Sequence, residues 1–196
     1  MSATCEVHVV KVGGSLLDLP GFALKLQRFL QSRRHAHAVV VVGGGELVEQ
    51  VRKWHFERPI DAVAGHWMCV DLMTITSRLV RARLPELALV EDDRHLLSRI
   101  GEPGVTLFGV ASWLRHAEPY LQGTRLGEGW HVTSDAIAGR LAVVLRAHRL
   151  TLLKSADAPL PGSRDLQALA ELEYIDRSLP QLANELPLVE FINLRD

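Results

Sequence analysis

Short, mainly apolar runs recur along this chain, and the first two end in glycine. Residues 7–12 lead into Gly13, and residues 39–42 lead into Gly43. Runs of roughly four to eight such residues, bounded by turn residues, are typical of strands buried on both faces of a parallel sheet. Further runs of this kind predict strands at residues 87–90, 105–110, 150–153 and 188–194.

The segments between these runs have helical character. Apolar residues recur at helical spacing over residues 22–30, and a helix is expected to begin directly after the second glycine cluster. Thr133 or Ser134 is expected to cap a helix that runs to about residue 148. The helices predicted here cover residues 22–30, 46–58, 60–84, 93–100, 134–148 and 179–185, and a loop is predicted over 117–131. Strands that alternate with helices predict an α/β fold, a three-layer sandwich with a mainly parallel central sheet.

Composition and charge exclude several classes of function and partner. At 196 residues and 47% hydrophobic content, the chain is expected to form one domain, residues 1–196. Its 22 lysines and arginines nearly balance 23 acidic residues, so neither a nucleic acid nor a membrane is an expected partner. Cys5 and Cys69 match no metal or redox spacing, which predicts no metal site and a reducing compartment. Since no apolar run approaches about 20 residues, we expect a soluble cytoplasmic protein.

The predicted strand ends carry glycine, lysine and hydroxyl side chains, which is where ligands of open parallel sheets bind. Lys11 is followed by Gly13, Gly14 and Ser15, so backbone N–H groups could approach phosphate oxygens beside an ammonium group. Residues 43–45 repeat the glycine turn at a helix N-terminus. Two such turns suit a donor and an acceptor phosphate, although each alone is also typical of an ordinary strand-to-helix connection. Neither turn has the P-loop or the dinucleotide-binding pattern.

Four motifs, in order along the chain, resemble those of the amino acid kinase superfamily. Residues 11–17, Lys-Val-Gly-Gly-Ser-Leu-Leu, look like its opening motif, and Gly43-Gly44-Gly45 resembles its acceptor loop. Residues 133–138, Thr-Ser-Asp-Ala-Ile-Ala, and residues 152–157, Leu-Leu-Lys-Ser-Ala-Asp, resemble a helix start and a strand end of its nucleotide half. The resemblance implies an acceptor-binding half over about residues 1–130 and a nucleotide-binding half over about residues 131–196.

The resemblance also implies roles for individual residues. Two lysines would flank the migrating phosphoryl group and an aspartate would organise both, a role that competes with plain helix capping for Asp135. His66 would donate to an acceptor phosphate, or serve the structure alone. The catalytic set is Lys11, Asp135 and Lys154; the ATP-binding set is Gly13, Gly14, Ser15, Ser134 and Asp157; the acceptor-binding set is Gly43, Gly44, Gly45 and His66.

Two further segments narrow the resemblance to one branch of that superfamily. Residues 65–68, Gly-His-Trp-Met, and residues 129–135 resemble the short branch that includes the methanofuran-pathway aminomethyl-furanmethyl phosphate kinase, although His131 stands where aspartate is usual. This implies that ATP, with Mg²⁺ on its phosphates, converts a small phosphomonoester into a diphosphate in a homodimer or higher oligomer. Two alternatives remain open: a carboxylate acceptor, and a kinase-like protein that binds nucleotides or anions without catalysis.

Overall fold

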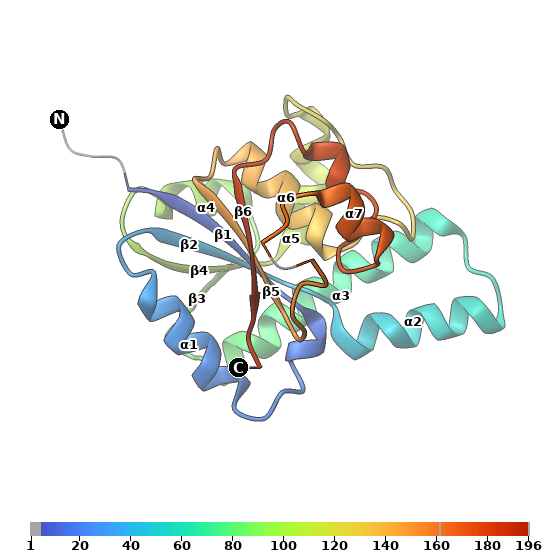
Figure 1. Ribbon diagram of the computed structural model, residues 1–196, viewed down its shortest axis with the longest axis horizontal. Helices are drawn as coiled ribbons and strands as arrows, with labels where there is room; N and C mark the ends of the chain where they lie inside the picture. Colours follow the sequence, from blue (N-terminus) through green and yellow to red (C-terminus); the bar gives the residue numbers. More distant parts are fainter. Residues whose placement is uncertain (1–4, 161, 196) are drawn as a thin grey trace.

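A six-stranded, all-parallel sheet forms the centre of the computed structural model, which describes residues 5–160 and 162–195 (Figure 1). The strand order is β3-β4-β2-β1-β5-β6, so β1 lies between β2 and β5. The strands are β1 (Val7–Val12), β2 (His37–Val42), β3 (Ala88–Val90), β4 (Gly104–Phe108), β5 (Arg149–Lys154) and β6 (Leu188–Asn193). The predicted α/β fold with a parallel central sheet is therefore confirmed.

Helices cover both faces of the sheet, and each face has its own hydrophobic core. Alternate residues of β1 point to opposite faces, so Val9 joins one core and Val10 the other. The first core contains side chains of α5 and α6, while the second contains side chains of α1 and of the end of α3. Figure 1 shows α5 and α6 on one face of the sheet and α1 on the other. The helices are α1 (Phe22–Ser32), α2 (Gly45–Glu57), α3 (Ala62–Arg83), α4 (Asp93–Arg99), α5 (Val110–His116), α6 (Ser134–Val144) and α7 (Leu166–Glu171).

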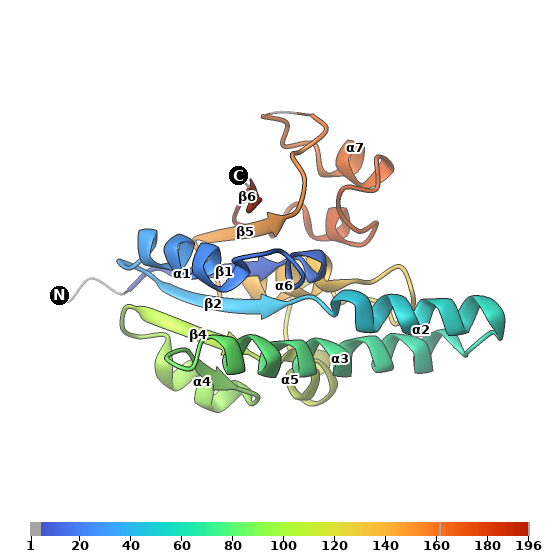
Figure 2. The same cartoon turned by 90° about the horizontal axis from the view of Figure 1, so that it is seen from below.

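Helices α2 and α3 form an antiparallel hairpin that extends past the carboxyl ends of the strands (Figure 2). The two helices pack along each other, and α3 returns along one face of the sheet, against β2, β3 and β4. No helix in the part of the chain that the structure describes is long and apolar enough to span a membrane. Because the α2–α3 hairpin extends past the strands, it forms one wall of the space above the ends of β1 and β2.

The structure corrects several predicted boundaries. Helix α6 ends at Val144 rather than near residue 148, because Arg146 adopts a left-handed conformation with φ 48° and stops the helix. The helix expected over residues 179–185 is only a 3₁₀ turn, Leu179–Leu182, since the chain must reach β6 by Leu188. Helices α5 and α7 were not predicted. The two halves expected on either side of residue 130 share one continuous sheet, because β1 pairs with both β2 and β5.

Candidate active site

The two glycine turns meet above the carboxyl ends of β1 and β2. A Cβ atom on Gly14 would lie 2.2 Å from the backbone nitrogen of Gly45, and one on Gly43 would lie 2.9 Å from the nitrogen of Gly14. Gly45 also has a φ of 59°, which residues with a side chain rarely adopt. Only glycine allows the two backbones this approach, so the two predicted phosphate cradles lie side by side.

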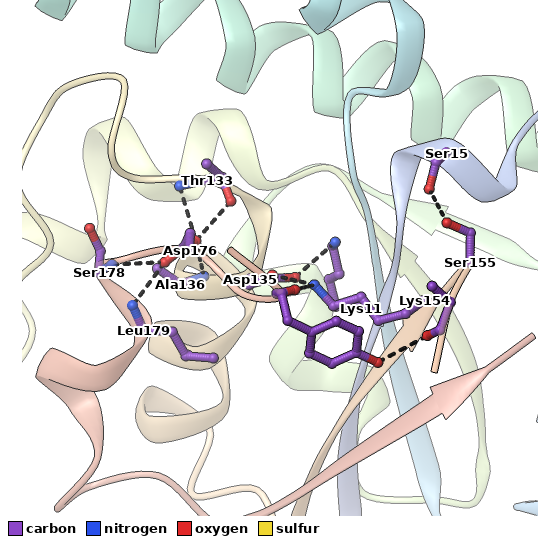
Figure 3. A network of polar contacts seen from close by, with 12 residues as sticks. Lys11, Ser15, Thr133, Asp135, Ala136, Lys154, Ser155, Asp176, Ser178 and Leu179 are labelled. Atoms are coloured by element: carbon purple, nitrogen blue, oxygen red, sulfur yellow. Dashed lines mark hydrogen bonds and ion pairs between the residues drawn. The ribbon is translucent and has the colours of Figure 1, made fainter. Parts of the chain in front are cut away.

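Three charged side chains from three elements converge beside these turns (Figure 3). Lys11 lies near the end of β1, Asp135 in the first turn of α6, and Lys154 at the end of β5. The Lys11 ammonium is 2.8 Å from Oδ1 of Asp135, and the Lys154 ammonium is 2.6 Å from Oδ2. The structure thus brings together all three residues predicted to be catalytic.

The carboxylate of Asp135 is only 3% exposed, so its charge depends on the two lysines. Burial alone would raise the pKa of Asp135, but the ammonium groups of Lys11 and Lys154 outweigh that effect and lower it to about 2. For Lys154, burial lowers the pKa, Asp135 opposes that shift, and Lys11 adds to it. With both ammonium groups protonated, the cluster holds one net positive charge, which suits it to stabilise phosphate oxygens.

A pocket of about 560 Å³ opens between the glycine turns, the α2–α3 hairpin and the segment before α6. Its lining combines polar groups with apolar side chains, and we name the apolar part the apolar wall. Of the predicted residues it includes Gly14, Ser15, Gly43, Gly44, Gly45, His66 and Ser134. The apolar wall consists of Val48, Val70, Met73, Trp130, Val132 and Ile137. Ser15 and Ser134, predicted for the nucleotide, thus share this pocket with the residues predicted for the acceptor.

His66 is buried on α3, with its Nδ1 3.3 Å from the carbonyl oxygen of Gly129. A carbonyl can only accept, so Nδ1 carries the proton and donates. Burial lowers the pKa of His66, which favours the neutral ring. In that tautomer Nε2 is an acceptor, so the ring must take up a proton before Nε2 can donate to a phosphate.

The ends of β1 and β5 are joined by a hydrogen bond of 2.9 Å between Ser15 Oγ and Ser155 Oγ (Figure 3). Asp157 follows two residues later, exposed, and its Oδ1 accepts a hydrogen bond of 3.3 Å from Asn193 Nδ2. Asp157 is not part of the pocket lining. Among the predicted binding residues, it is thus the one placed on the outer, β6 side of the catalytic cluster.

Two residues beside the cluster were missed by the sequence analysis. Lys154 Nζ donates to the carbonyl oxygen of Tyr174 at 2.7 Å, and Asp176 accepts from the hydroxyl of Thr133 at 2.8 Å. Thr133 occupies the N-cap position of α6, as predicted, but its side chain makes no cap hydrogen bond within the helix and donates to Asp176 instead. The sequence signal was slight, an acid directly after the apolar Ile175.

Comparison with known proteins supports the architecture. No protein-family model and no curated protein matches the sequence. Among solved structures, the chain is similar to uridylate kinase from Archaeoglobus fulgidus, with TM-score 0.61, 19% identity, and coverage of 95% of this chain and 90% of that one. It is also similar to UMP kinase from Ureaplasma parvum, with TM-score 0.62, 13% identity, and coverage of 96% and 91%.

A third similar structure is not named a kinase. It is N-acetylglutamate synthase from Neisseria gonorrhoeae, in complex with coenzyme A and L-arginine, with TM-score 0.56, 14% identity, and coverage of 97% of this chain and 56% of that one. At such identities the likeness concerns the fold alone. The chain has the fold of the amino acid kinase superfamily.

Proposed function

We propose that this protein is an ATP-dependent phosphotransferase that moves the γ-phosphoryl group of ATP onto a small anionic acceptor. The observation that carries the proposal is the convergence of Lys11 and Lys154 on Asp135, at 2.8 and 2.6 Å, beside two touching glycine turns. Phosphoryl transfer spreads negative charge over the equatorial oxygens and depends on positioning and electrostatics. Two ammonium groups held by one buried carboxylate supply such a charge environment.

The nucleotide side would use the end of β1 and the start of α6. In this proposal the turn at Gly13 and Gly14 binds ATP phosphates through the backbone N–H of Gly14, because the N–H of Gly13 donates to the carbonyl oxygen of Leu153 at 2.9 Å. The Ser15 and Ser134 hydroxyls donate to the phosphates, and Asp157 faces the nucleoside. The place of a Cβ atom at Gly14 is taken by the backbone of Gly45, so glycine is required there by the contact between the two turns. Mg²⁺ would arrive on the ATP phosphates and neutralise part of their charge.

The acceptor side would use the second glycine turn and the apolar wall of the pocket. The N-terminus of α2, at Gly43, Gly44 and Gly45, favours a negative group. The apolar side chains further along suit an organic body, so we propose a small phosphomonoester, similar to aminomethyl-furanmethyl phosphate, that becomes a diphosphate. The bond between the γ-phosphorus and the β-γ bridging oxygen breaks as an acceptor phosphate oxygen bonds to the γ-phosphorus, and ADP leaves. Protonated His66 would donate to the acceptor phosphate.

The exposed face of α3 supports a homodimer. Met68, Leu72, Ile75 and Leu79 follow one another at helical spacing, and three of them are 46%, 46% and 40% exposed (Met68, Ile75 and Leu79). Such a stripe on a 22-residue helix can pack against its own copy about a twofold axis. We therefore propose that two copies pair through α3, in the cytoplasm, where ATP is available.

An ADP-release assay over phosphorylated alcohols, nucleoside monophosphates and amino acids tests the function. Lys11→Ala should lose at least about 100-fold in kcat, because a charge at the reaction centre is removed. Lys53→Ala, an exposed lysine on α2, is the matched control and should keep the wild-type rate. A variant Lys11→Ala that turns over the best acceptor at the wild-type rate would refute the proposed centre.

Two outcomes would favour other functions for the same fold. A product trapped by hydroxylamine would indicate an acyl phosphate and hence a carboxylate acceptor. ATP binding without turnover of any acceptor would indicate a binding protein.

A further inference from the structure

One short segment outside the sheet contacts Lys154 of the charged cluster and the first turn of α6, which carries Asp135. It consists of residues 174–179, between α7 and the 3₁₀ turn that begins at Leu179, and we name it the 174–179 segment. Its first residue, Tyr174, accepts a hydrogen bond from Lys154 Nζ through its carbonyl oxygen at 2.7 Å. Its Asp176 binds the start of α6, which carries Asp135. The segment therefore joins the two catalytic elements that lie on the nucleotide side.

Asp176 uses both carboxylate oxygens, and each meets N–H or O–H donors (Figure 3). On one side, Oδ2 accepts from the backbone nitrogen of Thr133 at 3.1 Å, from its hydroxyl at 2.8 Å, and from the nitrogen of Ala136 at 2.8 Å. On the other side, Oδ1 accepts from the nitrogens of Ser178 at 3.0 Å and Leu179 at 2.8 Å. A set made only of donors requires the ionised carboxylate, which a protonated acid or an amide cannot replace in full.

The N-terminus of α6 is thus capped from 40 residues away instead of by its own N-cap residue. A local threonine cap would need no buried charge. Burial, and next the nearby Asp135 carboxylate, raise the pKa of Asp176, so the ionised form is electrostatically unfavourable at this place. Capping a helix with a buried carboxylate beside a second carboxylate is electrostatically unfavourable. We therefore infer that the position of the first turn of α6 is important for function.

We propose that Asp176 is a positioning residue for phosphoryl transfer: it fixes the first turn of α6 so that Asp135 stands between Lys11 and Lys154. The inference rests on the proposed function, because it assigns Asp176 a share in catalysis without any contact with the substrate. Tyr174, in the same 174–179 segment, accepts a hydrogen bond from Lys154 through its carbonyl oxygen. One segment therefore sets the distance between the carboxylate and one of its two cations.

The test compares three variants in the full-length protein. Asp176→Asn keeps an oxygen that accepts from the backbone nitrogens of Ser178 and Leu179 but turns an NH₂ group toward the start of α6. Thr133→Val removes a single hydrogen bond to Asp176 with little change in side-chain shape. Asp165→Asn is the matched control, because Asp165 caps α7 through a 3.0 Å hydrogen bond from Ala168 and is exposed. Urea unfolding establishes the folded fraction of each variant under assay conditions.

We expect Asp176→Asn to lower kcat by about 100-fold, the effect of a misplacement on the order of 1 Å. KM for the acceptor should stay within about threefold, because its proposed contacts lie at residues 43–45 and His66, whereas KM for ATP should rise, because the first turn of α6 also carries Ser134. Thr133→Val should show a smaller loss of kcat in the same sense, and Asp165→Asn should stay within about twofold of wild type. Equal kcat in Asp176→Asn and Asp165→Asn, after correction for folded fraction, would overturn the proposal.

Hydrogen exchange separates this inference from the proposed function, because it needs no turnover. The amides of Thr133 and Ala136 should exchange at least about tenfold faster in Asp176→Asn and at the wild-type rate in Asp165→Asn. Unchanged exchange at these amides overturns the positioning role, whether or not the protein is a kinase. If no acceptor is turned over by wild type while these amides still respond, the proposed function fails but the link from Asp176 to α6 stands.

Discussion

Replacing Gly14 with alanine tests whether the contact between the two glycine turns is needed for activity. The new Cβ atom would lie 2.2 Å from the backbone nitrogen of Gly45, whereas real Cβ contacts essentially never fall below 3.0 Å. The turns must therefore separate by about 0.8 Å or more, and both carry predicted ligand-binding backbone. A shift on the order of 1 Å can lower the rate about 100-fold, and overpacking costs about 1–3 kcal/mol of unfolding free energy.

Gly101→Ala is the matched control for that substitution. Nothing lies within 4 Å of a Cβ atom on Gly101, and its φ lies outside the left-handed region. The assay measures kcat/KM for ADP release, with thermal unfolding followed by circular dichroism. We expect Gly14→Ala to lose about 100-fold in kcat/KM while Gly101→Ala keeps the wild-type value. Equal activity of the two variants would show that the approach of the two turns has no role in catalysis.

Three further predictions follow from the charged cluster and from α3. The stabilisation of ionised Asp135, roughly 2 kcal/mol for a pKa lowered from 3.8 to about 2, is complete well above pH 4 and is lost as pH falls toward 2. Urea unfolding of wild type and Asp135→Asn should therefore show a gap that narrows by about 1 kcal/mol between pH 6 and pH 3; a constant gap contradicts it. Lys154 loses its charge as pH rises, and burial lowers its pKa, so kcat should begin to fall at a lower pH than it would with an ordinary lysine. Lys154→Arg should shift this fall in kcat to higher pH in a pH–rate profile, because arginine stays protonated. Ile75→Glu should give a monomer in sedimentation velocity, whereas Leu24→Glu on α1 should leave a dimer; a monomeric wild type would contradict the pairing through α3.

The strands and the glycine turns were predictable because their signals are local. Buried parallel strands are continuous apolar runs, and β1 and β2 are buried along their whole length. The glycines that follow mark a backbone approach that no other residue allows. Helix α5 was missed because its first residue, Val110, was assigned to the strand predicted over residues 105–110, and α7 was missed because its six residues are too few to show a helical period.

The long-range part of the site had no comparable signal. Pairing of Lys11, Asp135 and Lys154 was implied by a resemblance between motifs, while their distances depend on the order of strands in the sheet. The contact between Asp176 and Thr133 spans 43 residues and involves a turn with no periodic pattern. A sequence shows which side chains could cap a helix from within it, but it does not show a cap supplied by a distant segment.

The strand order explains why one carboxylate can serve two cations. Since β1 lies between β2 and β5, its carboxyl end is next to the second glycine turn on one side and next to the end of β5 on the other. Lys11 on β1 pairs in register with Leu152, so Lys154 lies only two residues beyond it on β5. Asp135 enters from α6, on the face opposite α1, and reaches both ammonium groups without belonging to either strand. A centre divided in this way depends on the placement of α6, and for that reason the contacts that hold the start of this helix matter as much as the charges themselves.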